Sequence, residues 1–300
     1  MTIPKKKFVL RKISHIKIQE IKQIFTGLAM RDNRIRAVLL QGSRANSHII
    51  PDVYQDYDIF LVVNQMEDFI SDHRWTSAFG KRIIWQLPYE MDSVDEHPVE
   101  KTGFHYLMLF EDQSRIDLTL YPKEKIDSNF KPDSLSIVWL DKDALFTDIG
   151  KPNDRDYHIK KPTEKEFAEC CNEFLWVSTN ISKGLKRNEI TYAKAMMEGP
   201  VRRMFMRMIE WYIGTETGFS VSFGHSGKMM KNYLDKRAYK KILTTYPDYK
   251  IRNIRDSIFI MMGIFNEYAL HVAKKLRFKY DHEEYENVIE FLQRQFSEKK

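Results

Sequence analysis

The chain has 300 residues, of which 43% are hydrophobic and 13% aromatic, so it can bury a sizeable core and form one large domain or two smaller ones. Its two cysteines, Cys170 and Cys171, are adjacent, which excludes a disulfide framework, and no C-x-x-C or H-E-x-x-H spacing offers a zinc site. The basic N-terminus lacks the apolar stretch of a signal peptide and no run approaches the ~18 apolar residues that cross a bilayer, so we expect a protein of a reducing cytoplasm.

The first half of the chain carries short runs of β-branched and aromatic residues. We expect a helix over 14–30, helical pieces over 66–79, and a hairpin loop at the four polar residues 111–114. The predicted strands are 35–40, 57–63, 81–87, 104–110, 115–121 and 135–140. This pattern predicts a mixed α/β unit built around a sheet.

The second half changes to helical periodicity. Thr163 and Glu166 form a capping box that begins a predicted helix over 163–187. Further helices are expected over 190–213, with a kink or break at Gly199–Pro200, over 251–278, and after Asp281, with a glycine-rich loop over 215–227. The second half is therefore expected to be an all-α bundle.

Residues 150–162 combine glycine, two prolines and charge between the two patterns. We place the domain boundary in this segment, with a first domain over 1–155 and a second over 156–300. The fold class predicted is α+β, a mixed sheet followed by a helical domain. The net charge is +6, but acidic residues are interspersed along most of the chain, so charge alone does not indicate a partner.

Three aspartates in the first half point to metal chemistry. Asp56 and Asp58 are two residues apart at the start of an apolar strand, so their side chains project to one face. Like charges at such a place repel unless a cation neutralises them, and hard oxygen ligands suit Mg²⁺. If the strand with Asp117 pairs beside the strand with Asp58, three carboxylates converge on a space for two metal ions. Taken singly, each aspartate is better explained as an ordinary charge at the end of an element, whereas the three together favour a metal site.

Gly42 and Ser43 close the first predicted strand. Glycine allows a sharp turn, and the Ser43 hydroxyl with nearby amides can hold phosphate oxygens, while Arg44 adds a donor at the same place. The ordered set of strand, Gly-Ser turn, aspartate pair and later strand aspartate resembles the DNA polymerase beta type nucleotidyltransferase fold.

The resemblance extends further along the chain. The segments GSRAN, YQDYDI, FHYLMLFEDQSRIDLTL, EFLWVSTNISKGL and GPVRRMFMRMIEWYIG are similar to those of the aminoglycoside 6-adenylyltransferases, which modify streptomycin. The resemblance implies an ATP-binding nucleotidyltransferase domain and a helical domain, with the antibiotic bound between them. It makes Asp56, Asp58 and Asp117 the metal carboxylates and Gly42, Ser43 and Arg44 nucleotide-binding residues.

The expected reaction is attack by an antibiotic hydroxyl on the α-phosphorus of ATP, with pyrophosphate leaving in line. Asp117 is best placed to take the proton from that hydroxyl or to bridge the metal that lowers its pKa. We expect catalysis to depend on positioning and charge neutralisation, without a covalent intermediate.

An aminoglycoside is a polycation, so its site should present carboxylates, to which aromatic rings can add. Glu173 and Trp176 on the 163–187 helix and Glu198 before the Gly-Pro break are candidates, although Trp176 could equally be bundle core and the glutamates surface charges. Lys194 and Lys228 are candidates for ATP oxygens, with surface lysines as the alternative.

Two rival functions stay open at this stage. One keeps the chemistry but uses a nucleic acid 3′ end as acceptor, for which a groove of basic and aromatic residues is expected. The other is a non-catalytic nucleotide-binding module, against which the third carboxylate argues. We expect no membrane association and favour a monomer.

Overall fold

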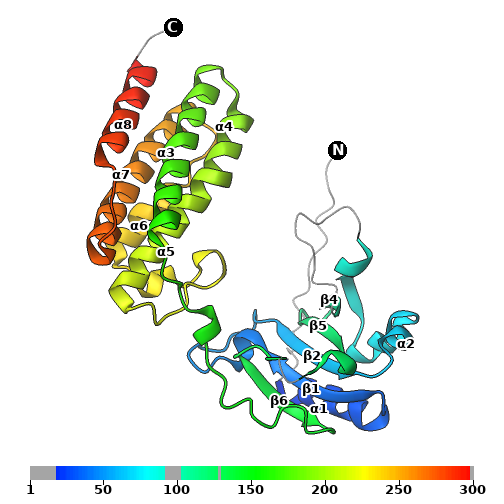
Figure 1. Ribbon diagram of the computed structural model, residues 1–300. Coiled ribbons are helices and arrows are strands. Elements are labelled where there is room, and N and C mark those ends of the chain that lie inside the picture. The colour runs from blue at the N-terminus through cyan, green and yellow to red at the C-terminus, as the bar shows by residue number, and fades with distance from the viewer. Residues whose placement is uncertain (1–17, 92–102, 128–129, 298–300) are drawn as a thin grey trace, which may run out of the picture. The chain divides into compact units, whose positions relative to one another are not determined.

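The computed structural model describes residues 18–91, 103–127 and 130–297. By its internal packing the chain divides into two compact units, Met1–Asp156 and Tyr157–Lys300 (Figure 1). The first contains a sheet and the second is helical, as the predicted α+β class requires.

All six predicted strands are present. Their bounds are β1 Ile35–Gln41, β2 Tyr57–Val63, β3 Arg82–Gln86, β4 Phe104–Phe110, β5 Arg115–Pro122 and β6 Ser136–Asp141. They form one sheet in the order β3-β4-β5-β2-β1-β6. The β2–β5 pair is parallel and the other four pairs are antiparallel. The polar residues 111–114 connect β4 and β5 as the predicted hairpin loop.

The two faces of this sheet have different cover. Helix α1, Ile18–Arg31, packs its apolar residues on one face against inward side chains of β1, β2 and β5. Residues 14–17 of the predicted helix lie outside the described part of the chain. On the other face, Phe60 and Val62 of β2 pack with Phe146 and the segment that flanks β6. Between β2 and β3, α2 (Met66–Ile70) is followed by a 3-10 segment, His73–Phe79.

Helices of the second unit bury one large common core. Helix α3, Glu164–Lys186, begins at the predicted capping box of Thr163 and Glu166. The others are α4 Ile190–Met196, α5 Arg202–Thr217, α6 Lys236–Leu243, α7 Ile251–Leu276 and α8 His282–Ser297. The rings of Phe174 and Phe265 stack at 3.8 Å between centroids, which joins α3 to α7 in the centre of this core.

The Gly199–Pro200 break takes an unexpected form. The chain continues through it as a π-helical turn, Met197–Val201, so α4 and α5 follow one another without a loop. Pro200 has no backbone N–H to donate within the helix, and the wider π-helical turn lets the helix continue past it. Such π-helical turns are frequent at functional sites. Helix α5 also continues to Thr217, into the segment predicted as loop.

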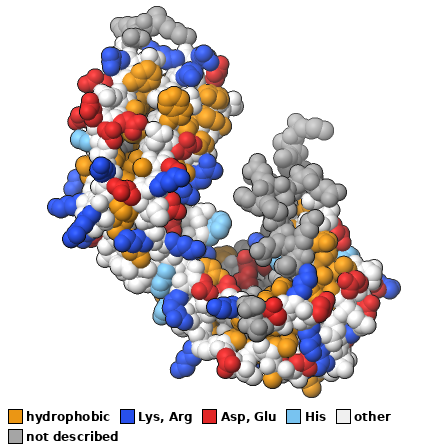
Figure 2. Space-filling model, viewed as in Figure 1, with side chains coloured by type: hydrophobic (Ala, Val, Ile, Leu, Met, Phe, Trp, Pro, Cys, Tyr) orange, Lys and Arg blue, Asp and Glu red, His pale blue; other side chains and the backbone are white. Residues whose placement is uncertain are grey.

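The surface mixes the two charge signs. Figure 2 shows basic and acidic side chains interspersed over the visible face of both units, as the sequence predicts. Both cysteines are buried in α3. In the described part of the chain, no helix has the length and apolarity needed to cross a membrane.

Candidate active site at the start of strands β2 and β5

The parallel pairing of β2 with β5 brings two of the predicted aspartates together. Asp58 and Asp117 are directly in register, and Asp56 precedes β2 by one residue, two positions before Asp58. Tyr57 and Ile116, which alternate with them, face α1. Since side chains alternate along a strand, the carboxylates of Asp58 and Asp117 lie on the opposite face of the sheet.

Arg115 lies among these carboxylates. Its Nε and Nη2 atoms donate to the two oxygens of Asp117, each at 2.7 Å. Its Nε is also 3.6 Å from Oδ2 of Asp56. The guanidinium therefore neutralises part of a strongly acidic cluster, and it holds Asp117 in the bidentate geometry that makes such pairs strong.

The surroundings of Asp58 disfavour the negative charge of its carboxylate. Burial, followed by the negative charges of Asp117 and Asp56, raises the pKa of its carboxyl to about 6, although Arg115 opposes this shift. A carboxyl that is buried beside two others holds its proton because the charged form lacks water and a counter-ion. This is a place where added positive charge is strongly favoured.

Gly42 makes room for Asp58. It begins the 3-10 turn Gly42–Ala45 with φ of +67°, and a Cβ atom at this position would lie 2.2 Å from Oδ2 of Asp58. Its N–H donates to the carbonyl of Leu135 at 3.0 Å, which fixes the turn against the start of β6. Both the backbone conformation and the contact require glycine.

Arg44 supports the loop that leads to the aspartates. Its Nε donates to the carbonyl of Asp56 at 2.9 Å and its Nη2 to that of Gln55 at 2.6 Å. Its guanidinium stacks 3.9 Å from the ring centre of Tyr57, on the side of the sheet that faces α1. In this arrangement Arg44 positions Asp56 through its backbone, and its predicted contact with nucleotide stays a prediction.

A cavity of about 460 Å³ adjoins the same turn. Its walls include Ser43, Arg44, Ile49, Tyr57 and Ser114. Because Tyr57 faces α1, this volume and the carboxylates lie on opposite faces of the sheet, with Gly42–Ala45 at their common edge.

The cluster as it stands is closed by the arginine. Across residues 18–91, 103–127 and 130–297, no three acidic, His or Cys side chains are placed to hold a metal ion. Arg115 engages both oxygens of Asp117. A metal ion held jointly by Asp58 and Asp117 would compete with this guanidinium for the negative charge of Asp117.

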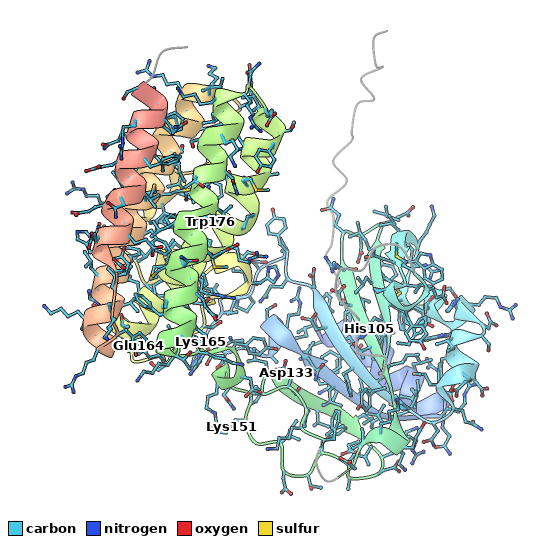
Figure 3. The ribbon with its side chains drawn as sticks, turned by 45° about the horizontal axis from the view of Figure 1, so that its top comes forward. His105, Asp133, Lys151, Glu164, Lys165 and Trp176 are labelled. Atoms are coloured by element: carbon cyan, nitrogen blue, oxygen red, sulfur yellow. The ribbon has the colours of Figure 1, made fainter. Side chains whose placement is uncertain are left out.

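Three neighbours of the cluster escaped the sequence analysis. Arg115 had a signal, since an R-x-D spacing within a strand places both side chains on one face. Asp133 raises the pKa of Asp58 and accepts from the backbone N–H of Leu135 at 2.7 Å. His105 of β4 pairs its Nδ1 with the Thr119 hydroxyl at 3.0 Å, and burial lowers its pKa. Figure 3 labels His105 on the sheet and Asp133.

In the helical unit, two of the predicted residues are held in ion pairs and two others lie on α3. Glu198 is engaged by Lys194 at 3.2 Å and by Arg202 at 3.0 Å, and Lys194 also donates to the carbonyl of Pro247. Trp176, labelled on α3 in Figure 3, is 70% exposed, which excludes the alternative that it packs in the bundle core. Glu173 is half-buried on the same helix.

Lys228 is exposed directly after the 3-10 turn His225–Gly227. Near this turn is a cavity of about 450 Å³. Its charged walls are Glu198, Arg202, Arg203, Arg207 and Glu210. Three arginines make it a poor host for a polycation, so the cavity is less suited to an aminoglycoside than the exposed α3 surface.

Comparison with known proteins shows the family to which this chain belongs. Residues 16–295 match the family described as streptomycin adenylyltransferase. The chain belongs to the streptomycin adenylyltransferase family. The match includes the aspartate cluster and nearly all of the helical unit.

Individual members of this streptomycin adenylyltransferase family are also similar. The aminoglycoside 6-adenylyltransferase of Bacillus subtilis is 41% identical over 87% of this chain and 92% of its own length. That of Campylobacter jejuni is 41% identical over 87% and 90%, and that of Staphylococcus aureus 33% over 93% and 98%. A crystal structure of an aminoglycoside 6-adenyltransferase from Bacillus subtilis matches with 32% identity and a TM-score of 0.46, covering 94% of this chain and 100% of the other.

Proposed function

We propose that this protein is an aminoglycoside 6-adenylyltransferase, which transfers AMP from ATP to a hydroxyl group of the antibiotic and releases pyrophosphate. Streptomycin is the first acceptor to test. The observation that carries the proposal is the register of Asp58 with Asp117 beside the Gly42 turn, in a chain of this family.

The donor set fits Mg²⁺. Carboxylate oxygens are the ligands that hard divalent cations prefer, and the pKa of Asp58 is raised by burial and then by the negative charges of Asp117 and Asp56, which a cation would offset. Asp56, Asp58 and Asp117 would hold two metal ions. Bound Mg²⁺ would neutralise the triphosphate and lower the pKa of the attacking hydroxyl.

Residues of the chain would then position the reactants. Gly42 and Ser43 present backbone N–H groups and a hydroxyl at the turn beside Asp58, where phosphate oxygens can be held. Asp117 would accept the proton of the acceptor hydroxyl, or hold it through the metal. Arg44 keeps Asp56 in place through its carbonyl. Lys194 and Lys228 remain candidates for ATP oxygens, although Lys194 would first have to leave Glu198.

The helical unit would bind the acceptor and the sheet unit ATP with Mg²⁺. The exposed ring of Trp176 can stack against the guanidinium or ammonium groups of an aminoglycoside, and Glu173 on the same helix adds a carboxylate. Glu198 is occupied by two basic side chains and is a weaker candidate. We propose a monomeric enzyme of the cytoplasm with no nucleic acid or membrane partner.

Pyrophosphate release tests the proposal directly. Purified protein with ATP, Mg²⁺ and streptomycin should release pyrophosphate and yield an antibiotic that is heavier by one adenylyl group. Asp58→Asn should fold and release none. Release with tRNA and with no aminoglycoside of a panel would overturn the acceptor, and release without added divalent metal in the presence of a chelator would overturn the metal.

A further inference from the structure

Arg115 supplies positive charge to the acidic cluster, which is also what a bound metal ion would supply. It satisfies both oxygens of Asp117 at 2.7 Å and lies 3.6 Å from Asp56, so it touches two of the three carboxylates proposed as metal ligands. The hydrogen bonds to Asp117 occupy one lone pair on each of its oxygens, and the positive charge of the guanidinium repels a metal ion at the lone pairs that remain.

The pairing follows from the strand. Arg115 and Asp117 are two residues apart in β5, so both side chains project to the same face in any regular strand. Of the two, Arg115 is the one that can move, because its long side chain is 45% exposed, whereas Asp117 is short and 21% exposed.

We propose that Arg115 is an internal counter-cation that competes with the metal for Asp117 and Asp56 and transfers to the nucleotide's phosphates when the metal binds. This inference rests on the proposed function, since it takes these carboxylates as metal ligands. A guanidinium fork fits phosphate oxygens as well as it fits a carboxylate, so the metal–nucleotide complex supplies a replacement for each partner.

Metal and nucleotide should therefore bind cooperatively. Metal alone must displace Arg115 without offering it a new partner, which weakens binding. Metal together with triphosphate releases the arginine to phosphate, which recovers that loss. The size of this coupling is set by Arg115 and should fall when its charge is removed.

Binding of Mn²⁺, a spectroscopically visible substitute for Mg²⁺, tests the proposal in the full-length chain by calorimetry, with no turnover required. Arg115→Gln should bind Mn²⁺ alone about tenfold more tightly than the wild type, the size expected for one charge-assisted bidentate pair. With a non-hydrolysable α,β-methylene analogue of ATP present, the advantage should disappear.

Arg74→Gln is the matched control. Arg74 makes the same kind of bidentate pair with Asp72, two residues away, with distances of 2.7–2.9 Å. The Arg74→Gln protein should bind Mn²⁺ with the affinity of the wild type. Arg115→Lys, which keeps the charge without the fork, should be intermediate, and it provides the comparison if the glutamine variant does not fold.

The two possible failures are distinguishable. If Arg115→Gln and Arg115→Lys bind Mn²⁺ alone no more tightly than Arg74→Gln, the competition is overturned while the proposed function stands. If no variant and no wild-type protein binds Mn²⁺ with or without the analogue, the metal site of the proposed function falls and the inference with it.

Discussion

Replacing Gly42 with alanine should lower the catalytic rate far more than its effect on the stability of the sheet unit would explain. The added Cβ would lie 2.2 Å from Oδ2 of Asp58, whereas an ordinary contact begins at 3.4 Å, so the carboxylate must retreat by more than an ångström. A reacting group misplaced by about 1 Å lowers the rate by roughly 100-fold. The φ of +67° adds about 1–2 kcal/mol of backbone strain for a residue with a side chain.

Gly218→Ala provides the comparison for that strain. Gly218 ends α5 at φ of +62°, and nothing lies within 4 Å of the Cβ that it would gain. Thermal unfolding should show a loss of about 1–2 kcal/mol for Gly218→Ala and at least as large a loss for Gly42→Ala, which also displaces Asp58. Pyrophosphate release should fall roughly 100-fold in kcat/KM for Gly42→Ala only. If the two variants retain the same kcat/KM, the contact between Gly42 and Asp58 does not position the carboxylate for catalysis.

Further predictions concern charge, packing and the acceptor. The native pKa of Asp58, about 6, is above its unfolded value, so its ionisation destabilises the metal-free protein as pH rises toward 6 and remains unfavourable above it. In the absence of metal, Asp58→Asn should therefore stabilise the protein by about 1–2 kcal/mol at pH 8, observed as a higher Tm, and should leave the Tm unchanged near pH 3. An equal shift of Tm at both pH values would contradict this. For the same reason the apparent Mg²⁺ affinity of the wild type, followed by calorimetry, should fall about tenfold per pH unit below 6 and level off above it. Arg202 is buried between Glu198 and the α6–α7 connection, so Arg202→Met should cost about 3 kcal/mol in chemical denaturation, whereas exposed Arg203→Met should change little. Trp176→Ala should raise the KM for the aminoglycoside about 3- to 30-fold and leave the KM for ATP unchanged, and a change in both would remove Trp176 from the acceptor site.

The strands could be predicted because their residues alternate or are uniformly apolar. β2 and β4 have the bounds expected from the sequence. The pairing of β4 with β5 follows from the short hairpin loop between them, and the pairing of β2 with β5 places two apolar strands in the buried centre of the sheet. Helix α6 was missed because it has only eight residues, four of them basic, so its apolar face of Ala238, Tyr239 and Ile242 is too short to stand out in the sequence. Its start did have a signal, since Asp235 caps the N–H groups of Arg237 and Ala238.

The site was predictable as a list of carboxylates and less so as an arrangement. Two aspartates on one strand face follow from spacing, but their distance from Asp117 depends on which strands are neighbours and in what register. The engagement of Arg44 by the carbonyls of Gln55 and Asp56 depends on how a loop 11 and 12 residues away folds back, and no local pattern carries that information. The pairing of Glu198 with Lys194 and Arg202 did have a local signal, since each basic residue lies four positions from Glu198.

The R-x-D spacing of β5 also bears on how the chain folds. The acidic cluster requires β5 to pair beside β2, which brings Asp117 into register with Asp58. Because Arg115 lies on the same strand as Asp117, the strand that adds this carboxylate also adds a positive charge that balances it. The sheet can thus be completed without a bound metal ion, so assembly of this unit does not depend on the supply of metal.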